Sequence, residues 1–312
     1  QINNDGWVVW YGYEGTDWEI FLYNGTSATK LTDNDNNEGY PQINAGWTVW
    51  SGQVGTDSEI FLHSTGTTQL TDNDNDDKNP MVNGNGVTVW QGYDGNDWEI
   101  FLYNGTATIP LTNNGYDDEY PQINDNGWAV WSGNDDIDWE IFLYNGTDTI
   151  KLTNNSNDDQ FPEISNDGWV VWQGYDGNDW EIFLYNGTTT IPLTDNDYDD
   201  VLPQINDNEW VTWQGYDGTD WEIFLYNRTA TIQLTNNGYH DNYPEINDNG
   251  WVAWQGRDNT DWEIFIYNGA STTKLTDNEY DEALPQINNN NSVVWYGNDG
   301  TDYEIYLARL QE

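Results

Sequence analysis

Residues 203–235 read PQINDNEWVTWQGYDGTDWEIFLYNRTATIQLT, and this stretch decides the fold. It contains four short runs, PQIN, WVTWQG, WEIFLYN and ATIQLT, and the last three are rich in the β-branched and aromatic residues typical of strands. The connections are polar: NDNE, the Asp-Gly turn YDGTD, and NRT, which reads NGT in several other copies and then favours a hairpin. The stretch therefore predicts one four-stranded antiparallel sheet.

The same stretch recurs along the whole chain. Its Glu-Ile-(Phe/Tyr) string returns at steps of 40 or 41 residues, with the glutamate at Glu19, Glu59, Glu99, Glu140, Glu181, Glu222, Glu263 and Glu304. The last Trp of the second run keeps the same spacing, and the Pro of the first run recurs in seven repeats at steps of 39 or 41 residues. A period near 40 with several short strands is typical of β-propeller blades. We expect one all-β domain, an eight-bladed propeller of four-stranded antiparallel blades.

The expected blades cover approximately residues 1–39, 40–79, 80–120, 121–161, 162–202, 203–243, 244–284 and 285–312. Pro110 and Pro192 fall in the fourth run, and proline lacks the N–H that a central strand needs, so the fourth strand should be outermost. The last repeat has no fourth run, which predicts a three-stranded last blade without strand exchange. The alternative is seven blades plus a partial one, which would leave two apolar faces uncovered.

The net charge of the chain limits the kinds of molecule that it can bind. The 312 residues include 55 acidic and seven basic ones, for a formal net charge of −48. Such a surface repels phosphate backbones and anionic lipids, so we expect no nucleic-acid partner. No apolar run is long enough to span a bilayer, so we expect no membrane insertion, and the lack of cysteine excludes disulfides and thiolate chemistry. Cations and basic protein surfaces are the favoured partners.

Acidic connections are the strongest functional signal. In a propeller, the loop that leads to the next blade and the turn between the second and third strands lie at the same end, and both are acidic here. Ca²⁺ favours shells of carboxylate and carbonyl oxygens, so this end is a candidate calcium site. The residues proposed as ligands, with their equivalents in other blades, are Asp195, Asp197, Asp199, Asp200, Asp217 and Asp220. The alternative is that these side chains bond their own backbone in Asx-turns.

The tryptophans occupy only three recurring positions per repeat, which indicates packing rather than ligand binding. The position just after the acidic turn lies nearest a loop, so Trp98, Trp180 and Trp221 are the candidates for stacking on sugars.

Two further kinds of site follow from local pattern. Asn-x-Thr triplets at the third connection are glycosylation candidates, although Asn-Gly there also serves the hairpin: Asn24, Asn104, Asn145, Asn186 and Asn227. The last repeat should expose a strand edge at Tyr303, Ile305 and Leu307. An exposed edge invites self-association or a strand from a partner.

Catalytic groups are sparse. The only histidines, His63 and His240, stand at non-equivalent positions, and no serine lies in a nucleophile-elbow motif. Nearly identical repeats give nearly identical environments, whereas an active site needs one distinct cluster. We therefore expect that the chain is not an enzyme.

The repeat, with LT-(D/N)-N, P-x-I-(N/S), G-x-x-x-W and G-D-W-E-I-(F/Y)-(L/I)-Y-N-G in order, resembles the TolB-like β-propeller repeat. Similar repeats occur in the propeller domains of prolyl-oligopeptidase-type proteins. The resemblance covers the whole chain and implies a propeller that makes protein contacts or gates a hydrolase domain. The gating role does not carry over, because these 312 residues hold no hydrolase domain. The family's Ser-Pro-Asp-Gly turn is NDNG or NNDG here.

These observations predict a secreted, cell-surface or periplasmic module that binds or assembles through many similar contacts, with Ca²⁺ as its candidate cofactor. A carbohydrate-binding propeller is the alternative, and a propeller hydrolase is the least favoured function.

Overall fold

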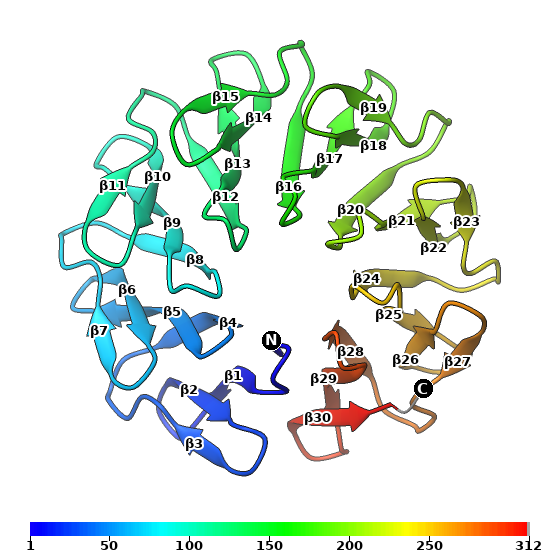
Figure 1. Cartoon of the computed structure of the whole chain (residues 1–312). Coiled ribbons are helices and arrows are strands. Elements are labelled where there is room, and N and C mark those ends of the chain that lie inside the picture. Colours follow the sequence, from blue (N-terminus) through cyan, green and yellow to red (C-terminus); the bar gives the residue numbers. More distant parts are fainter. Residues whose placement is uncertain (311–312) are drawn as a thin grey trace. The chain divides into compact units, whose positions relative to one another are not determined.

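A computed structural model describes residues 1–310 and shows an all-β, eight-bladed β-propeller fold, with no helix among those residues. Nothing in this part of the chain is therefore a helix able to cross a bilayer. The chain divides into two compact units, Gln1–Pro162 and the part from Glu163 onward. Every sheet consists of consecutive antiparallel strands, as predicted (Figure 1).

The first unit contains four blades, whose strands follow in chain order. Blade 1 has β1 (Val8–Tyr13), β2 (Trp18–Tyr23) and β3 (Ala28–Lys30). Blade 2 has β4 (Glu38–Asn44), β5 (Trp47–Val54), β6 (Asp57–His63) and β7 (Thr67–Gln69). Blade 3 has β8 (Asp77–Val82), β9 (Thr88–Tyr93), β10 (Trp98–Tyr103) and β11 (Thr108–Pro110). Blade 4 has β12 (Asp118–Ile123), β13 (Ala129–Asn134), β14 (Trp139–Tyr144) and β15 (Thr149–Lys151).

The remaining blades repeat this plan. Blade 5 has β16 (Asp159–Ile164), β17 (Val170–Tyr175), β18 (Trp180–Tyr185) and β19 (Thr190–Pro192). Blade 6 has β20 (Asp200–Ile205), β21 (Val211–Tyr216), β22 (Trp221–Tyr226) and β23 (Thr231–Gln233). Blade 7 has β24 (Asp241–Ile246), β25 (Val252–Arg257), β26 (Trp262–Tyr267) and β27 (Thr272–Lys274). Blade 8 has β28 (Glu282–Ile287), β29 (Ser292–Asn298) and β30 (Tyr303–Arg309).

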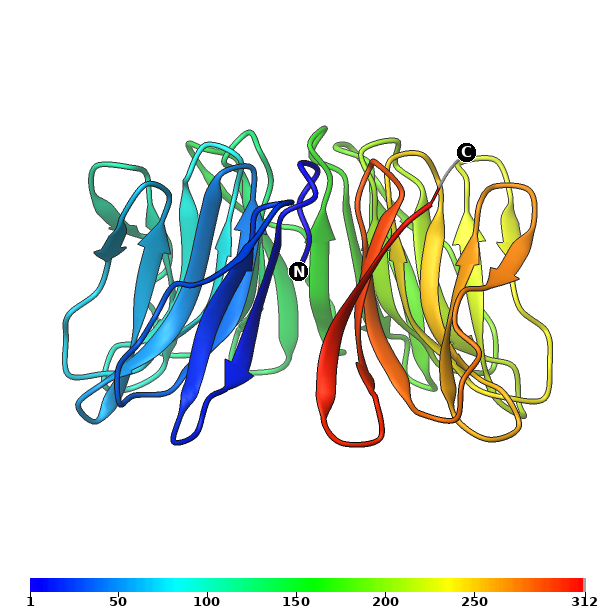
Figure 2. The same ribbon diagram turned by 90° about the horizontal axis from the view of Figure 1, so that it is seen from below.

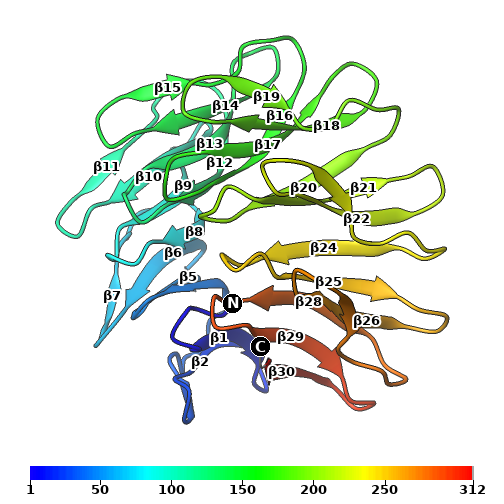
Figure 3. The same cartoon turned by 45° about the vertical axis from the view of Figure 1, so that its right-hand side comes forward.

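The order of strands within a blade agrees with the sequence. In the second unit β20, β24 and β28, the first strands of their blades, contact one another and are therefore innermost (Figure 3). The proline-containing strands β11 and β19 are edge strands, as proline's missing N–H requires. Loops gather at the two ends of the strands, as the second unit shows in side view (Figure 2).

The first and last blades have fewer strands than the others. Blade 8 has three, as predicted, and within residues 1–310 its sheet, β28-β29-β30, includes no strand from the start of the chain. Blade 1 also has three, because its innermost run forms only one bridge, between Ile2 and Val8, where a full strand was expected.

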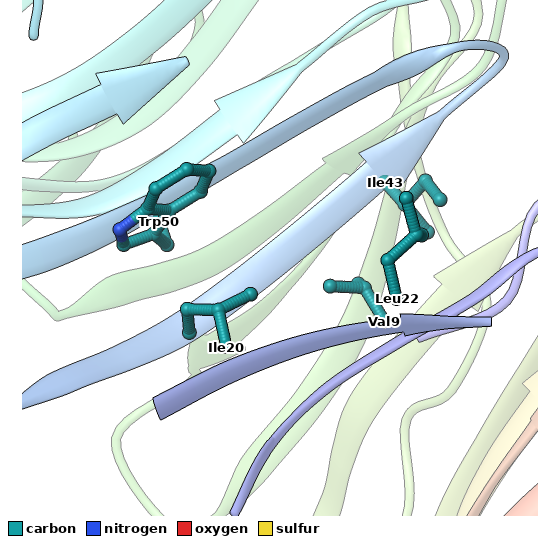
Figure 4. Packing of buried hydrophobic residues seen from close by; sticks show 5 residues of the cluster. All are labelled: Val9, Ile20, Leu22, Ile43 and Trp50. Carbon is teal, nitrogen blue, oxygen red and sulfur yellow. The ribbon is translucent and has the colours of Figure 1, made fainter. Parts of the chain in front are cut away.

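The core consists of apolar layers between neighbouring sheets. Between blades 1 and 2, the buried residues are Val9, Ile20, Leu22, Ile43 and Trp50 (Figure 4). Burying side chains of this size contributes about 1.5–3 kcal/mol each. The same residue types recur between later blades, which explains why both faces of the second and third strands are largely apolar.

A bulge in the innermost strand was not predicted. Leu202, just before Pro203, has a left-handed φ of 54°, and the register of β20 against β21 shifts there. The Leu202 N–H donates to Gln173 Oε1 of blade 5 at 3.0 Å. Tyr120, Tyr243 and Leu284 make the same bond to the preceding blade. The bulge therefore ties each of these innermost strands to its neighbour and positions the loop before it.

Candidate functional site

The two acidic connections meet at one end of the blade, as predicted. In blade 6, the N–H of Asn237, in the loop after β23, donates to Glu222 Oε1 on β22 at 2.7 Å. In blade 5, the N–H of Trp180 at the start of β18 donates to Asp199 Oδ1 in the loop after β19 at 3.0 Å. These bonds hold the outgoing loop against the turn between the second and third strands. Carboxylates from both connections therefore come together.

The predicted ligands in the loop before blade 6 lie beside the turn of blade 5. Asp195 and Asp197 are exposed, and Asp199 is half-buried. The pKa of Asp179 in that turn is raised, chiefly by burial and then by nearby charges that include Asp199 and Asp197. These three aspartates therefore belong to the environment of blade 5.

Asp200 is a structural anchor. Its carboxylate accepts hydrogen bonds from Trp213 Nε1 at 2.7 Å and from Asn196 Nδ2 at 2.5 Å. Burial raises the pKa of Asp200 to about 7, and the charge of Glu181 adds to the rise. A Cβ at Gly215 would lie 2.2 Å from Asp200 Oδ1, so only glycine permits this approach. The recurring Gly of the second strand thus serves the carboxylate that holds the buried tryptophan.

Asp217 and Asp220 form a tighter group with Glu222. The ligand atoms of these three residues lie within 4.8 Å of one another. Asp217 is exposed and accepts bonds from the Thr219 and Asp220 N–H groups, as an Asx-turn does. Asp220 and Glu222 are 4% and 0% exposed, so two of the three carboxylates are withdrawn from water.

The buried carboxylates of this group are not fully satisfied. Asp220 Oδ2 and Glu222 Oε2 have no hydrogen-bond partner. Burial raises the pKa of Glu222 to about 7, and the charges of Asp241 and Asp220 act in the same direction. An unpaired buried carboxylate is costly, so this environment favours a proton or a bound cation.

Sequence reasoning missed Glu222, which was assigned to the general pattern of strand β22. The available signal was the recurrence of one glutamate at the same place in an otherwise apolar strand of all eight repeats. A charged residue retained in such a run indicates a role that packing cannot explain.

Blades 3 and 5 contain the same three residue types and, like blade 6, have no lysine opposite the third-strand phenylalanine. In blade 3, Asp94, Asp97 and Glu99 have ligand atoms within 4.8 Å of one another, and Asp97 Oδ1 and Glu99 Oε2 have no partner. Burial is the main cause that raises the pKa of both Asp97 and Glu99. Blade 5 has Asp176, Asp179 and Glu181, with both carboxylate oxygens of Asp179 unpaired.

Blades 4 and 7 hold a lysine among their carboxylates. Lys151 Nζ lies 2.7 Å from Asp135 Oδ2 and 3.1 Å from Glu140 Oε1. Lys274 Nζ lies 2.8 Å from Asp258 Oδ2, and its hydrogen bond holds the pKa of that carboxyl well below the usual range. A lysine ammonium thus neutralises the cluster in these blades.

Asn and Asp at the opposite end of the blades serve the fold. Asn206 Oδ1 accepts from the N–H of Asn208 and of Trp210, which is the Asx pattern. Its Nδ2 donates to Asn247 O of the next blade at 2.8 Å. Similar bonds link other neighbouring blades within each unit, for example Asn83 to Asn124 O at 3.0 Å. At this end, therefore, asparagine side chains close backbone turns and bond the next blade.

Aromatic pairs stand beside the acidic turns. Trp98, Trp180 and Trp221 are half-buried, whereas the second-strand tryptophans such as Trp213 are buried. Each half-buried indole packs edge-on or tilted against the tyrosine before the turn, at centroid distances of 5.5 to 5.7 Å. These three tryptophans are thus more exposed than those of the second strand, and sugar binding stays a prediction.

The Asn-x-Thr triplets lie at the third connection. Asn104 Oδ1 accepts from the N–H of Thr106 and of Ala107, so its side chain closes the hairpin. The same bonds occur at Asn24, Asn145, Asn186 and Asn227. The turn therefore accounts for the asparagine, and glycosylation stays a prediction.

The histidines do not share an environment. His240 Nδ1 accepts the Trp221 N–H at 3.1 Å, where blade 5 uses Asp199. His63 lies at the end of β6 beside Thr67. Neither belongs to a group of three potential metal ligands within residues 1–310.

The last blade exposes its outer edge. Strand β30 pairs with β29 on one side, and among residues 1–310 no fourth strand joins its sheet. Tyr303 is 65% exposed and Ile305 is 38% exposed, whereas the equivalent Ile223 of blade 6 is fully buried. Leu307 is half-buried. The structure thus places all three predicted edge residues on this strand.

No family model and no curated protein matches the chain. Solved structures do match it. A puromycin-hydrolyzing peptidase of Mycobacterium tuberculosis is 13% identical, with a TM-score of 0.63 over 88% of this chain and 51% of the peptidase. The acylaminoacyl peptidase of Pyrococcus horikoshii is 9% identical, with a TM-score of 0.59 over 89% and 52%.

A third neighbour is a propeller by itself. The β-propeller domain of the Trilobed protease from Pyrococcus furiosus, described as having an open velcro topology, is 9% identical, with a TM-score of 0.62. The match covers 89% of this chain and 96% of that domain. The structural neighbours are propeller domains of prolyl-oligopeptidase-type peptidases. At these identities the likeness shows the fold alone, and this chain spans about half the length of the peptidases.

Proposed function

We propose that the chain is a non-catalytic, secreted, cell-surface or periplasmic module that binds partners through repeated contacts, with Ca²⁺ as a cofactor. The observation that carries the proposal is the open edge of β30. Unpaired N–H and C=O groups along such an edge accept an added strand. Similar surface groups in successive blades would then add avidity.

The chemistry of blade 8 indicates what kind of strand fits. Tyr306 pairs with Trp295 as Phe142 pairs with Trp131 in blade 4, where the next strand places Lys151 opposite Phe142. Blade 8 keeps the acidic residues that surround such a lysine, Asp299, Asp302 and Glu304, and all three are exposed. The net charge of −48 also opposes association between two copies. We therefore propose an extended partner segment that carries a lysine.

The test uses the chain's own outer strand as a probe. A peptide of residues 147–153, TDTIKLT, is titrated into the protein, with TDTIQLT as the matched peptide without the lysine. We expect TDTIKLT to bind and TDTIQLT to bind several-fold more weakly. The variant Ile305→Lys should lose binding, while Thr188→Lys, with the same charge change in the exposed connection between β18 and β19, should keep it. Equal binding to Ile305→Lys and Thr188→Lys would contradict the proposal, as would self-association through β30 seen by light scattering.

Carbohydrate binding is the second candidate, and the half-buried Tyr–Trp pairs favour it. An exposed aromatic face beside carboxylates can stack on a sugar ring while the carboxylates accept its hydroxyl protons. Glycan-array binding that disappears in Trp221→Ala and persists in Trp221→Tyr would establish this role. Hydrolase activity is the least favoured function, because the peptidase neighbours match only over their propellers.

A further inference from the structure

One position of the outer strand differs between blades. The residue opposite the third-strand phenylalanine is a lysine in three of them, at Lys30, Lys151 and Lys274. In four others it is Gln69, Pro110, Pro192 or Gln233. The strand pairing is the same in all seven, so the blades form a natural series in which one cationic side chain is present or absent.

The lysine reaches the same carboxylates wherever it occurs. In blade 1, Lys30 Nζ lies 2.5 Å from Glu14 of the turn and 3.1 Å from Glu19 of the third strand. Lys151 and Lys274 contact the equivalent turn aspartate and strand glutamate at distances from 2.7 to 3.4 Å. The ammonium group thus marks one place, between turn and strand, where the fold holds a positive charge.

Blades 3 and 6 keep the carboxylates without the lysine. None of their cluster residues forms an ion pair with any Lys or Arg in residues 1–310. Each cluster brings three carboxylates within 4.8 Å, and the two on the strand side are at least nine-tenths buried. Oxygens of those buried groups have no hydrogen-bond donor. Several buried charges without a counter-charge are strongly unfavourable, so the arrangement calls for a cation.

We propose that blades 3 and 6 each bind a Ca²⁺ ion at the place where blades 1, 4 and 7 hold a lysine ammonium. The ligands are Asp94, Asp97 and Glu99 in blade 3, and Asp217, Asp220 and Glu222 in blade 6. Calcium accepts carboxylates in irregular shells and completes them with water or backbone carbonyls. This inference rests on and deepens the calcium part of the proposed function, and its failure would leave the strand-binding part untouched.

Gln233→Lys is the decisive variant, with Gln233→Met as the matched control of similar length. Lysine occurs natively at this position in three blades, so the fold should persist, which near-ultraviolet circular dichroism checks. Calcium binding to chelator-treated protein is measured by titration calorimetry at pH 7.5 and 0.15 M KCl. We expect the number of bound Ca²⁺ ions to be lower by one in Gln233→Lys than in Gln233→Met. Terbium luminescence excited through tryptophan should fall in parallel.

Lys151→Gln is the reciprocal variant. It removes the ammonium from Asp135, Asp138 and Glu140, whose ligand atoms also lie within 4.8 Å, and should add one Ca²⁺ site. Equal stoichiometry in Gln233→Lys and Gln233→Met would overturn the proposal. So would a wild-type protein that takes up no Ca²⁺ at millimolar concentration, since the clusters would then be neutralised by protons alone.

Discussion

The two ends of each blade are both rich in Asn and acidic residues, but the hydrogen bonding of these side chains differs between the ends. At the end where the first strand connects to the second, both polar side-chain atoms of Asn206 bond backbone groups. Its Oδ1 accepts from N–H groups of its own turn, and its Nδ2 donates to Asn247 O of the next blade. At the other end, Asp220 and Glu222 are buried and keep oxygens without a donor. Asn and Asp therefore stabilise the fold at the first end, whereas buried carboxylates with unpaired oxygens destabilise it at the second.

The two ends differ in how many backbone N–H groups are free to donate to a side chain. A tight turn leaves its backbone N–H groups free, and an Asx side chain accepts them. Beside Glu222 the N–H groups already have partners, since Ile223 donates to Thr235 Oγ1 at 2.8 Å and the strand pairs with its neighbours. Glu222 Oε1 accepts the Asn237 N–H, but the second oxygen, Oε2, has no donor and must obtain its partner from a lysine, a proton or a cation.

Acidification should produce the largest change in stability, because several buried carboxylates, Asp118, Asp200 and Glu222 among them, titrate together. Burial raises the pKa of both Asp118 and Asp200 to about 7 from an ordinary value of 3.8. The folded state therefore binds more protons, and this stability is fully present below pH 4 and is lost as the pH rises through 7. In chelator, lowering the pH from 8 to 6 should stabilise the protein by about 1 kcal/mol for each such group.

Melting temperatures at pH 6 and pH 8 measure this effect. The Asp118→Asn variant should show a flatter dependence, because one of the titrating groups is gone. A melting temperature that falls between pH 8 and pH 6 would show that the carboxylates are not destabilising when ionised.

Asn206→Ala tests the opposite end. Asn206 is buried, and its loss leaves backbone groups of Asn208, Trp210 and Asn247 without a partner. We expect a loss of about 2 kcal/mol or more in the free energy of unfolding, measured with urea. Asn208→Ala removes an exposed bond at the same turn and should cost under about 1 kcal/mol. An equal loss of unfolding free energy in Asn206→Ala and Asn208→Ala would contradict the structural role given to the buried Asn206 side chain.

The smallest expected effect is a change in the free energy of unfolding that has opposite signs for equivalent substitutions in blades 6 and 4. Glu222→Gln removes a charge that burial and Asp220 disfavour, so in chelator at pH 8 it should stabilise by roughly 1 kcal/mol. Glu140→Gln removes the partner of Lys151 and should destabilise by a similar amount, roughly 1 kcal/mol. Thermal melts with and without Ca²⁺ measure both, and Ca²⁺ should reverse the sign for Glu222→Gln. Two variants with the same sign in chelator would contradict the role given to the lysine.

Much of the fold could be predicted because its signals are local and repeated. Pro110 and Pro192 predicted that the fourth strand is outermost, and the lack of a fourth run in the last repeat predicted the three strands of blade 8. The structure confirms both. The bulge at Leu202 could not be predicted, because its left-handed residue is not glycine and its partner, Gln173, comes from another blade.

The candidate site was predicted only in part. Asp217 and Asp220 were identified from the loop, but Glu222 was overlooked, and Asp200 proved to anchor Trp213. Loop composition shows which residues are available, whereas burial and donor supply decide which of them need a cation.

The sequence by itself determined the blade, the number of repeats and the end at which the acidic connections meet, because alternation, turn residues and period are properties of neighbouring residues. Only the tertiary structure decided which carboxylates are buried together and which are already bonded. Those outcomes depend on groups far apart in the sequence, such as Asp207 and Asp248, which are 41 residues apart, and on whether an outer strand brings a lysine within 3 Å of an acid.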